Sequence, residues 1–241
     1  MSTLDSPVWS ALTGAHRGGH RDLARGADVG SGRARSYPAD VCPFSAVADV
    51  RDPAAWADLA HLLAGDRLAV VPTFDPAHGD PVPTGWEVAW SIPGVQLVAG
   101  PTTPPPPAED ADLPVLALGE DDVDDMLALV ELTRPGPFER RTRLLGPYLG
   151  VRDPDGTLVA LAGERLHPGG AAELSAVCTH PRARGRGLAT RLVLTLVRDV
   201  RERGDVPFLH AAATNAEAVR LYQRLGFSPR RSVAFTGLRP P

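Results

Sequence analysis

One stretch, THPRARGRGLATRL at residues 179–192, constrains the fold of this chain more than any other. It places Gly185 and Gly187 among arginines, after a run typical of a strand and before Leu188, where helical periodicity begins. The first amides of a helix have no partners within it and carry partial positive charge, and glycine leaves the main chain open to an anion. The stretch therefore predicts an anion-binding turn at the end of a sheet, with phosphate as the expected anion. The alternative is an arginine-rich turn on a solvated surface.

The charge of the chain narrows what such a turn could bind. The 241 residues carry a net charge of −4, and all 25 residues counted as Lys+Arg are arginine. Nucleic-acid binding without sequence preference needs a basic excess, so nucleic acid is not an expected partner. The nucleotide P-loop pattern GxxxxGK[ST] is absent, and a dinucleotide fingerprint would need GxGxxG where this turn has GRGLAT.

Cysteine usage and hydropathy indicate the class of protein. Cys42 and Cys178 lie far apart and form no CxxC pair, which fits a reduced, cytoplasmic setting. No apolar run approaches the ~18 to 20 residues that a membrane span needs. The first residues, MSTLDSPVWSAL, lack the basic start and apolar block of an export signal. We expect a cytoplasmic globular protein that does not enter membranes, either a monomer or a homodimer.

A proline-rich segment, PTTPPPPAEDAD at residues 101–112, favours an extended linker between two parts of the chain. Residues 1–100 are expected to form an α/β domain, with loop or disorder around 14–35 and a helix at 54–64. All four tryptophans lie in this part, but no catalytic constellation does. Residues 113–241 alternate strands and helices irregularly, which indicates an α/β or α+β domain with a mixed sheet.

The elements expected within residues 113–241 follow from hydrophobic periodicity and turn residues. They are a strand at 115–119, helices at 120–132 and around 137–146, a hairpin turning at 155–156, a strand ending at 179, a helix at 188–203, a strand at 207–213, a helix at 216–225, and a last strand near 232–238.

A second motif, TNAEAVRLYQRLGF at residues 214–227, supplies a further constraint. Thr214 precedes Glu217 by the spacing of a capping box, and Gly226 is a typical helix stop. Asn215 is the single asparagine of the chain. Taken as structure alone, Asn215 is a helix cap and Tyr222 a half-buried aromatic with a solvated hydroxyl.

Together the two motifs resemble those of the GNAT superfamily of acyl-CoA-dependent N-acyltransferases. Arg182, Gly185 and Gly187 match its R/Q-x-x-G-x-G/A pattern between a strand and a helix. The N-x-x-A-x-x-L-Y-x-x-x-G-F pattern is matched by Asn215, Ala218, Leu221, Tyr222, Gly226 and Phe227. The resemblance covers residues 113–241 and is greatest to the FR47-like branch. It implies a mixed, mostly antiparallel sheet flanked by helices, with residues 1–100 as a degenerate GNAT-like half.

The resemblance also implies a co-substrate, acetyl-CoA, and a site for it without metal. Its diphosphate would be held by the loop and helix start, and its pantetheine arm would pair with the strand that ends at residue 179. The residues implied for binding are Val177, Cys178, Thr179, Arg182, Arg184, Gly185, Arg186, Gly187, Leu188, Ala189, Thr190, Asn215 and Tyr222. The Val177 amide would polarise the thioester carbonyl as an oxyanion-hole donor, and Tyr222 would protonate the departing thiolate.

The base that takes the proton of the acceptor amine is expected to be Glu173, acting through water. Strand alternation would place its side chain on the same face as Val177. Glu164 on the neighbouring strand is a weaker substitute, and a carboxylate without a catalytic role is the alternative for Glu173. His180 and His210 lack metal-ligand spacing with Cys178 and are expected in turn and strand roles. Direct transfer needs no covalent intermediate, so Cys178 is not expected as a nucleophile.

The expected reaction is transfer of an acetyl group from acetyl-CoA to a primary amine of a small molecule or amino acid, by direct attack through a tetrahedral intermediate. Two alternatives stay open. One is a protein N-terminal acetyltransferase, because NAEAVRLY also resembles the enzymes that acetylate ribosomal proteins. The other is an acyl-CoA-binding module without catalysis. The acceptor pocket is expected among the variable residues 120–150 and in the tryptophan-rich part.

Overall fold

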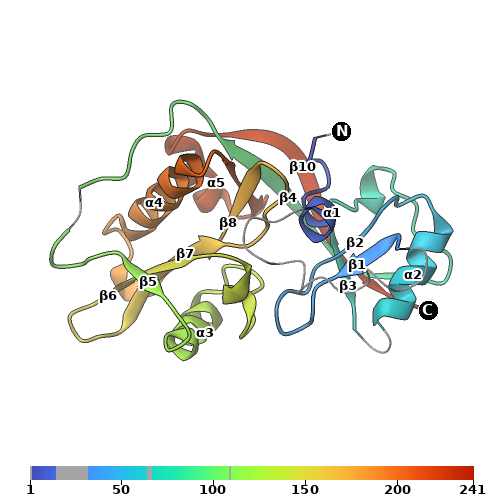
Figure 1. Cartoon of the computed structure of the whole chain (residues 1–241), viewed down its shortest axis with the longest axis horizontal. Coiled ribbons are helices and arrows are strands. Elements are labelled where there is room, and N and C mark those ends of the chain that lie inside the picture. Colours follow the sequence, from blue (N-terminus) through green and yellow to red (C-terminus); the bar gives the residue numbers. More distant parts are fainter. Residues whose placement is uncertain (1, 15–31, 64–66, 109) are drawn as a thin grey trace.

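One eight-stranded sheet runs through the molecule (Figure 1). The computed structural model describes residues 2–14, 32–63, 67–108 and 110–241. The strand order is β3-β10-β4-β9-β8-β7-β6-β5, in which β8 and β9 are parallel and the other neighbours antiparallel. The bounds are β3 Ala69–Pro72, β4 Glu87–Ala99, β5 Leu116–Leu118, β6 Tyr148–Arg152, β7 Leu158–Glu164, β8 Ala171–Thr179, β9 Val206–Ala212 and β10 Phe227–Arg239. This mixed, mostly antiparallel sheet with flanking helices confirms the predicted fold class.

Helices cover both faces of the sheet where β5 to β9 lie. Helix α4 (Leu188–Glu202) packs its leucine face on one side, and α3 (Val123–Thr133) lies on the other (Figure 1). Helix α5 (Ala216–Arg224) connects β9 to β10 and buries Tyr222 in the same core as α4. The predicted helices at 120–132, 188–203 and 216–225 are therefore present, within a few residues at their ends.

The residues before the sheet form a smaller α/β layer. Helices α1 (Pro7–Thr13) and α2 (Pro53–Leu63) pack near a two-stranded sheet of β1 (Ala34–Ser36) and β2 (Ser45–Val47). Trp56 is buried among Phe74 and Trp86 in this core. Helix α2 confirms the helix predicted at 54–64. Of the loop expected around 14–35, residues 15–31 lie outside the described residues, and the last two, Ala34 and Arg35, lie in β1.

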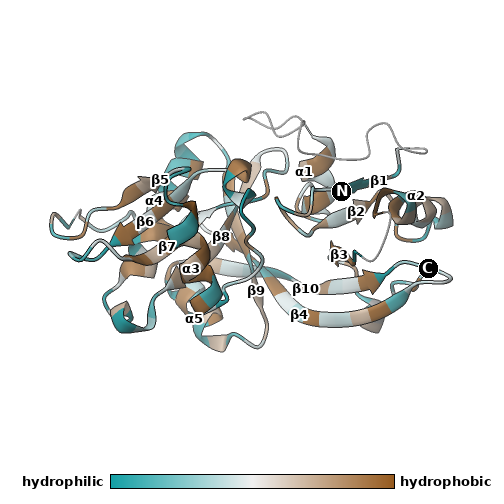
Figure 2. Ribbon diagram, turned by 90° about the horizontal axis from the view of Figure 1, so that it is seen from below, coloured by the Kyte–Doolittle hydropathy of each residue, from teal (hydrophilic) through white to brown (hydrophobic). Residues whose placement is uncertain are grey.

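Strands β4 and β10 form a long, bent pair that joins the two ends of the molecule (Figure 2). Strand β4 precedes the proline-rich segment 101–112, yet it lies between β9 and β10. Strand β3 also precedes that segment and pairs with the end of β10. Hydrogen bonds therefore connect the predicted parts 1–100 and 113–241 within one sheet, while the segment between them loops outside it (Figure 1).

One predicted helix is much shorter than expected. The stretch around 137–146 contains only a 3-10 turn, η3 (Thr142–Leu145). Prolines at 135, 137 and 147 and Gly146 surround it, and proline removes a main-chain donor and restricts the residue before it. Two further 3-10 turns, η2 (Pro76–His78) and η4 (Pro181–Ala183), follow strands β3 and β8.

Candidate functional site

The glycine–arginine turn lies between β8 and α4, as the sequence predicts. Gly185 and Gly187 have φ values of 79° and 75°, in the left-handed region that favours glycine, and Gly187 is the N-cap of α4. A Cβ built on either glycine would meet no heavy atom within 4 Å. These glycines therefore serve the turn and leave its surface open, rather than allowing close packing.

The first turn of α4 presents free main-chain donors. The first helical bond is donated by the Arg191 amide to the Gly187 carbonyl. Across the described residues, no bond is recorded for the amides of Leu188, Ala189 and Thr190, which is the normal condition of a helix start. Helix α4 has 15 residues and no acidic residue in its first turn, so nothing on the helix neutralises this positive end.

These donors open onto a cleft of about 690 Å³. The cleft lies among the end of β8, the start of α4, helix α5 and the segment after α3. Its lining residues are Thr133, Arg134, Pro135, Val177, Cys178, Thr179, Ala183, Arg184, Gly185, Gly187, Leu188, Ala189, Thr190, Asn215, Glu217, Ala218, Arg220, Leu221, Tyr222 and Arg224. The tertiary structure thus brings the two sequence motifs together around one cavity.

Four arginines of the cleft have no acidic partner. Within the described part of the chain, no ion pair or side-chain hydrogen bond involves Arg134, Arg184, Arg220 or Arg224. Arg220 and Arg224 are one helical turn apart on α5, so the sequence carried a signal for them that the motif analysis missed. Unpaired guanidinium groups around a cleft favour an anionic ligand.

Two other arginines of the turn, Arg182 and Arg186, were expected to bind the co-substrate but point to carboxylates of the protein instead. Arg182 bonds Asp155 at 2.8 Å, and Arg186 bonds Asp153 at 2.8 Å. Both carboxylates belong to the hairpin between β6 and β7. Neither arginine lines the cleft. Their visible role is to tie the turn to that hairpin, which fixes where the open glycines lie.

Tyr222 and Asn215 enter the cleft from α5. Tyr222 is 7% exposed, and burial, with a smaller effect of Cys178, raises the pKa of its hydroxyl to about 12. The phenol therefore stays protonated, as a proton donor must be. The Asn215 side chain accepts a bond from the Ala218 amide at 3.1 Å, so it caps α5 as well as lining the cleft.

Strands β8 and β9 part beside the cleft. Their pairing runs from Ala171 opposite Val206 to Leu174 opposite Leu209. Beyond that point β8 continues only along β7, and β9 continues only along β4. Val177, Cys178 and Thr179, on the stretch of β8 beyond its last pair with β9, line the cleft.

A bulge in β8 corrects one step of the sequence interpretation. Ser175 pairs with Gly163 and Cys178 with Leu161, so β8 has one residue more than β7 between these pairs. Ala176 in this bulge has a φ of 53°. An extra residue reverses the alternation of side chains. Strict alternation predicted that Glu173 and Val177 share a face of the sheet. Because of the bulge, they lie on opposite faces.

Glu173 is enclosed in an ionic cluster. Its carboxylate is 0% exposed, accepts two bonds from Arg165 at 3.0 and 2.9 Å, and bonds His210 Nδ1 at 2.7 Å. Burial by itself opposes ionisation, but Arg165 and His210 outweigh it and lower the pKa of Glu173 to about 2. A buried carboxylate of such low pKa is a poor proton acceptor.

The remaining titratable candidates have structural partners. Glu164 is 0% exposed and bonds Arg203 at 2.7 Å, while burial raises its pKa. His180 Nδ1 accepts a bond from the Arg182 amide and so caps η4, in agreement with its expected turn role. Burial raises the pKa of Cys178 to about 11, which keeps it a thiol.

The part of the chain that the structure describes has neither a metal-binding cluster nor a membrane-spanning helix. No group of three or more His, Cys, Asp or Glu side chains there could hold a metal ion. None of the described helices is long and apolar enough to cross a membrane.

This chain is similar in sequence and fold to known proteins. Residues 148–235, from the start of β6 into β10, match the FR47-like protein family model. A solved GNAT-family protein from Novosphingobium aromaticivorans is 39% identical, with a TM-score of 0.83 and full coverage of both chains. A GCN5-related N-acetyltransferase from Kribbella flavida shares the fold at 18% identity and a TM-score of 0.62, over 99% of this chain and 94% of that one.

A curated relative matches over a shorter stretch. The mycothiol acetyltransferase of Saccharopolyspora erythraea is 32% identical over 82 residues, which are 34% of this chain and 27% of that protein. The chain therefore matches about a quarter of the length of this relative. Identity over the whole length of the Novosphingobium protein is the stronger finding, and with the FR47-like match and the shared fold it shows that this chain is an acetyltransferase of the GNAT family.

Proposed function

We propose that this protein transfers an acetyl group from acetyl-CoA to a primary amine of a small molecule. The observation that carries the proposal is the cleft itself, where free helix-start amides, unpaired arginines and a protonated Tyr222 face one cavity. Coenzyme A is an elongated molecule with a diphosphate and a further phosphate at one end and a thiol at the other. Its phosphates match the free amides and arginines of the cleft, and its thiol end would lie near Tyr222.

The start of α4 would hold the diphosphate. The amides of Leu188, Ala189 and Thr190 would donate to its oxygens, because they lack partners within the helix. Arg184, Arg220 and Arg224 would supply charge around these donors. The open space over both glycines supports this assignment, since a side chain there would cover the donors.

The parted strands would hold the pantetheine arm and the thioester. Ala176 and Val177 have no partner in register on β7 because of the bulge, which supports the Val177 amide as a donor to the thioester oxygen. The amine nitrogen would attack the thioester carbon, and the carbon–sulfur bond would break. Tyr222 would give its proton to the sulfur, while water would accept the proton lost by the amine.

The acceptor would enter at the inner end of the cleft, beside Cys178. Thr133, at the end of α3, and Arg134 and Pro135 after it line the cleft within the variable segment expected to select the acceptor, and Thr133 bonds the Cys178 side chain. The similarity of 82 residues to a mycothiol acetyltransferase supports a small-molecule acceptor. A protein N-terminus remains the second candidate, and binding of acyl-CoA without turnover the third.

Calorimetry tests the site before any acceptor is known. The double substitution Arg220→Gln with Arg224→Gln should weaken acetyl-CoA binding about tenfold or more at low salt, because it removes two unpaired charges from the cleft. The matched control is Arg182→Gln with Arg186→Gln, which removes the same charge from arginines already bonded to Asp153 and Asp155. Equal losses in the two double variants would contradict the assignment of the phosphate site.

Turnover tests the reaction. A panel of amino acids, polyamines, aminosugars and short peptides should include an acceptor that releases free thiol from acetyl-CoA. For that acceptor, Tyr222→Phe should lower kcat by about a hundredfold with little change in acetyl-CoA affinity, since it removes only the proton donor. Binding of acetyl-CoA with no turnover across the panel would favour the non-catalytic alternative.

A further inference from the structure

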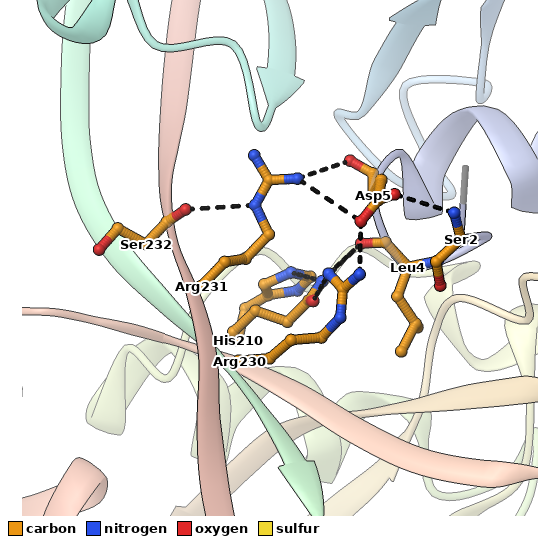
Figure 3. A network of polar contacts seen from close by, with 8 residues as sticks. Ser2, Leu4, Asp5, His210, Arg230, Arg231 and Ser232 are labelled. Carbon is orange, nitrogen blue, oxygen red and sulfur yellow. Dashed lines mark hydrogen bonds and ion pairs between the residues drawn. The ribbon is translucent and has the colours of Figure 1, made fainter.

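A chain of polar side chains connects the N-terminus to the place where β8 and β9 part. Figure 3 shows the part of it that runs from Asp5 and Arg230 to His210. It begins at Asp5, just before α1, whose carboxylate bonds Arg230. Arg230 NH1 donates to Gln96 Oε1 at 2.8 Å, and Gln96 Nε2 lies 3.1 Å from His210 Nε2. His210 Nδ1 then bonds Glu173 at 2.7 Å. These residues come from four strands and the N-terminal segment.

The bonds of Gln96 fix which way its amide points. Its oxygen accepts from Arg230, and its nitrogen also donates to the Leu4 carbonyl at 3.0 Å. The amide nitrogen must therefore face His210, so His210 Nε2 must be the acceptor. This leaves the ring proton on Nδ1, where it is donated to Glu173. The N-terminal segment and Arg230 thus select one tautomer of His210.

Packing fixes the plane of the same ring. His210 lies edge-on to Phe208 and to Phe235, with ring centroids 5.6 and 5.7 Å away and interplanar angles of 89° and 88°. Its side chain is only 2% exposed, although the residue as a whole is half-buried. The exposed part of His210 is therefore mainly main chain, at the edge of β9.

That main chain lies at a critical place. His210 is the first residue of β9 after the last pair with β8, Leu209 opposite Leu174. Its side chain thus anchors the strand at the point where the two strands separate. Arg230 reaches Gln96 from a second bulge, where β10 has one extra residue between Pro229 and Arg231. A bulge redirects a side chain out of the regular register, and here it directs Arg230 into the network.

We propose that His210 is a positioning residue for acetyl transfer, and that residues 2–5 at the N-terminus set its orientation through Gln96 and Arg230. The held ring fixes the β9 edge against which the thioester end of acetyl-CoA would lie, so this inference rests on the proposed function. Misplacing reacting groups by about 1 Å can cost a hundredfold in rate. The diphosphate end of the cleft, at α4 and α5, lies apart from the network.

Nitrogen NMR of histidine-labelled full-length protein tests the network without requiring activity. Comparison with His210→Gln assigns the ring signals among the seven histidines. The expected signal has a protonated Nδ1 and an unprotonated Nε2. The isosteric change Gln96→Glu replaces the donor with an acceptor, so Nε2 should become protonated. An unprotonated Nδ1 in the wild type, or no change in Gln96→Glu, would overturn the proposal.

Kinetics with an active acceptor tests the consequence for transfer, using two neighbouring arginines. Arg230→Gln should lower kcat about tenfold or more while the affinity for acetyl-CoA changes less than about twofold. Arg231→Gln is the matched control, because Arg231 also contacts Asp5, at 3.2 Å from its main-chain oxygen and 4.0 Å from its carboxylate, but does not bond Gln96. Asp5→Asn should also lower kcat, because it weakens the bond that holds Arg230. Since Asp5 is partly exposed, this variant is expected to fold, and it checks that a loss in Arg230→Gln is not due to misfolding.

The outcomes separate this proposal from the proposed function. If no acceptor is turned over but the NMR tautomer is as expected, the reaction assignment fails and the network stands as structure. If turnover is found and Arg230→Gln equals Arg231→Gln in kcat, the positioning role fails and the proposed function stands.

Discussion

At the scale of single residues, the structure assigns Glu173 a role different from the one that the sequence predicted. Its residue type and its place on the strand predicted a catalytic base. In the structure it has no exposed surface and is enclosed by Arg165 and His210. Arg165 is itself buried and lies over the Phe44 ring at 4.6 Å, so the ion pair is part of the contact between the N-terminal layer and the sheet. The carboxylate stabilises the fold here rather than meeting a substrate.

Substitution of Glu173 tests that role. Glu173→Gln should lower the free energy of unfolding at neutral pH by about 3–5 kcal/mol, because Arg165 would keep its buried charge without a partner. A carboxylate whose pKa is lower in the folded state than in the unfolded state stabilises the fold at pH values above its unfolded-state pKa. This stabilisation is lost as the pH falls toward the folded-state pKa. Wild-type stability should therefore fall between pH 4.5 and about 2 by a component that Glu173→Gln lacks.

Urea unfolding at a series of pH values measures both effects. Ser175→Ala, two residues further along β8, is a control for the loss of a small polar side chain on the same strand. A loss below about 1 kcal/mol for Glu173→Gln, or parallel pH curves for the two proteins, would show that the ion pair is not a major contribution to stability.

At the scale of elements, turns with left-handed glycines do two different jobs. Gly187 begins α4 and faces open space, whereas Gly226 ends α5 with a φ of 87° and packs against Thr103. A Cβ at Gly226 would lie 2.8 Å from the Thr103 main chain. The first glycine keeps a helix start accessible, and the second holds the proline-rich segment against the domain.

Alanine substitution at Gly187 and at Gly226 distinguishes these two roles by the loss of folding stability at each. Gly187→Ala should cost about 1–2 kcal/mol of folding stability, the price of a left-handed conformation alone. Gly226→Ala should cost clearly more, because the main chain of residue 103 must also move. Thermal unfolding of the two variants gives the comparison. A smaller loss of stability for Gly226→Ala than for Gly187→Ala would contradict this expectation. It would mean that the main chain at Thr103 moves away from the added methyl group at little cost.

At the scale of the whole molecule, the sheet crosses the boundary that the sequence marks. The proline-rich segment looks like a linker, and residues 113–241 carry every GNAT motif. Yet β4 comes from residues 87–99 and supplies the strand between β9 and β10. The division into parts at 101–112, and the degenerate GNAT-like nature of residues 1–100, stay predictions about the sequence.

Truncation tests whether the second part is independent. A fragment of residues 113–241 would lack β4, and β9 and β10 would each lose a neighbouring strand from the middle of the sheet. We expect no cooperative thermal transition and no binding of acetyl-CoA by this fragment, whereas the full chain should show both. A cooperative transition with retained binding would show that residues 113–241 fold alone.

Local signals were enough to predict much of the fold and of the cleft. The glycine–arginine turn, the cap at Asn215, the α4 face and the placement of Tyr222 each depend on a few neighbouring residues. The arginines of the turn show the limit of such signals. Asp155 bonds Arg182 and Asp153 bonds Arg186, while Arg184 has no such partner among the described residues. Local patterns do not predict this difference, because the hairpin lies about thirty residues away in the chain.

By itself the sequence determined the helices, the anion-binding turn and the family, because these depend on periodicity, capping and short motifs within single segments. Only the tertiary structure decided the insertion of β4 between β9 and β10, the bulge at Ala176 and the burial of Glu173. Those features arise from pairing between distant segments, where one extra residue in a strand turns a side chain to the opposite face.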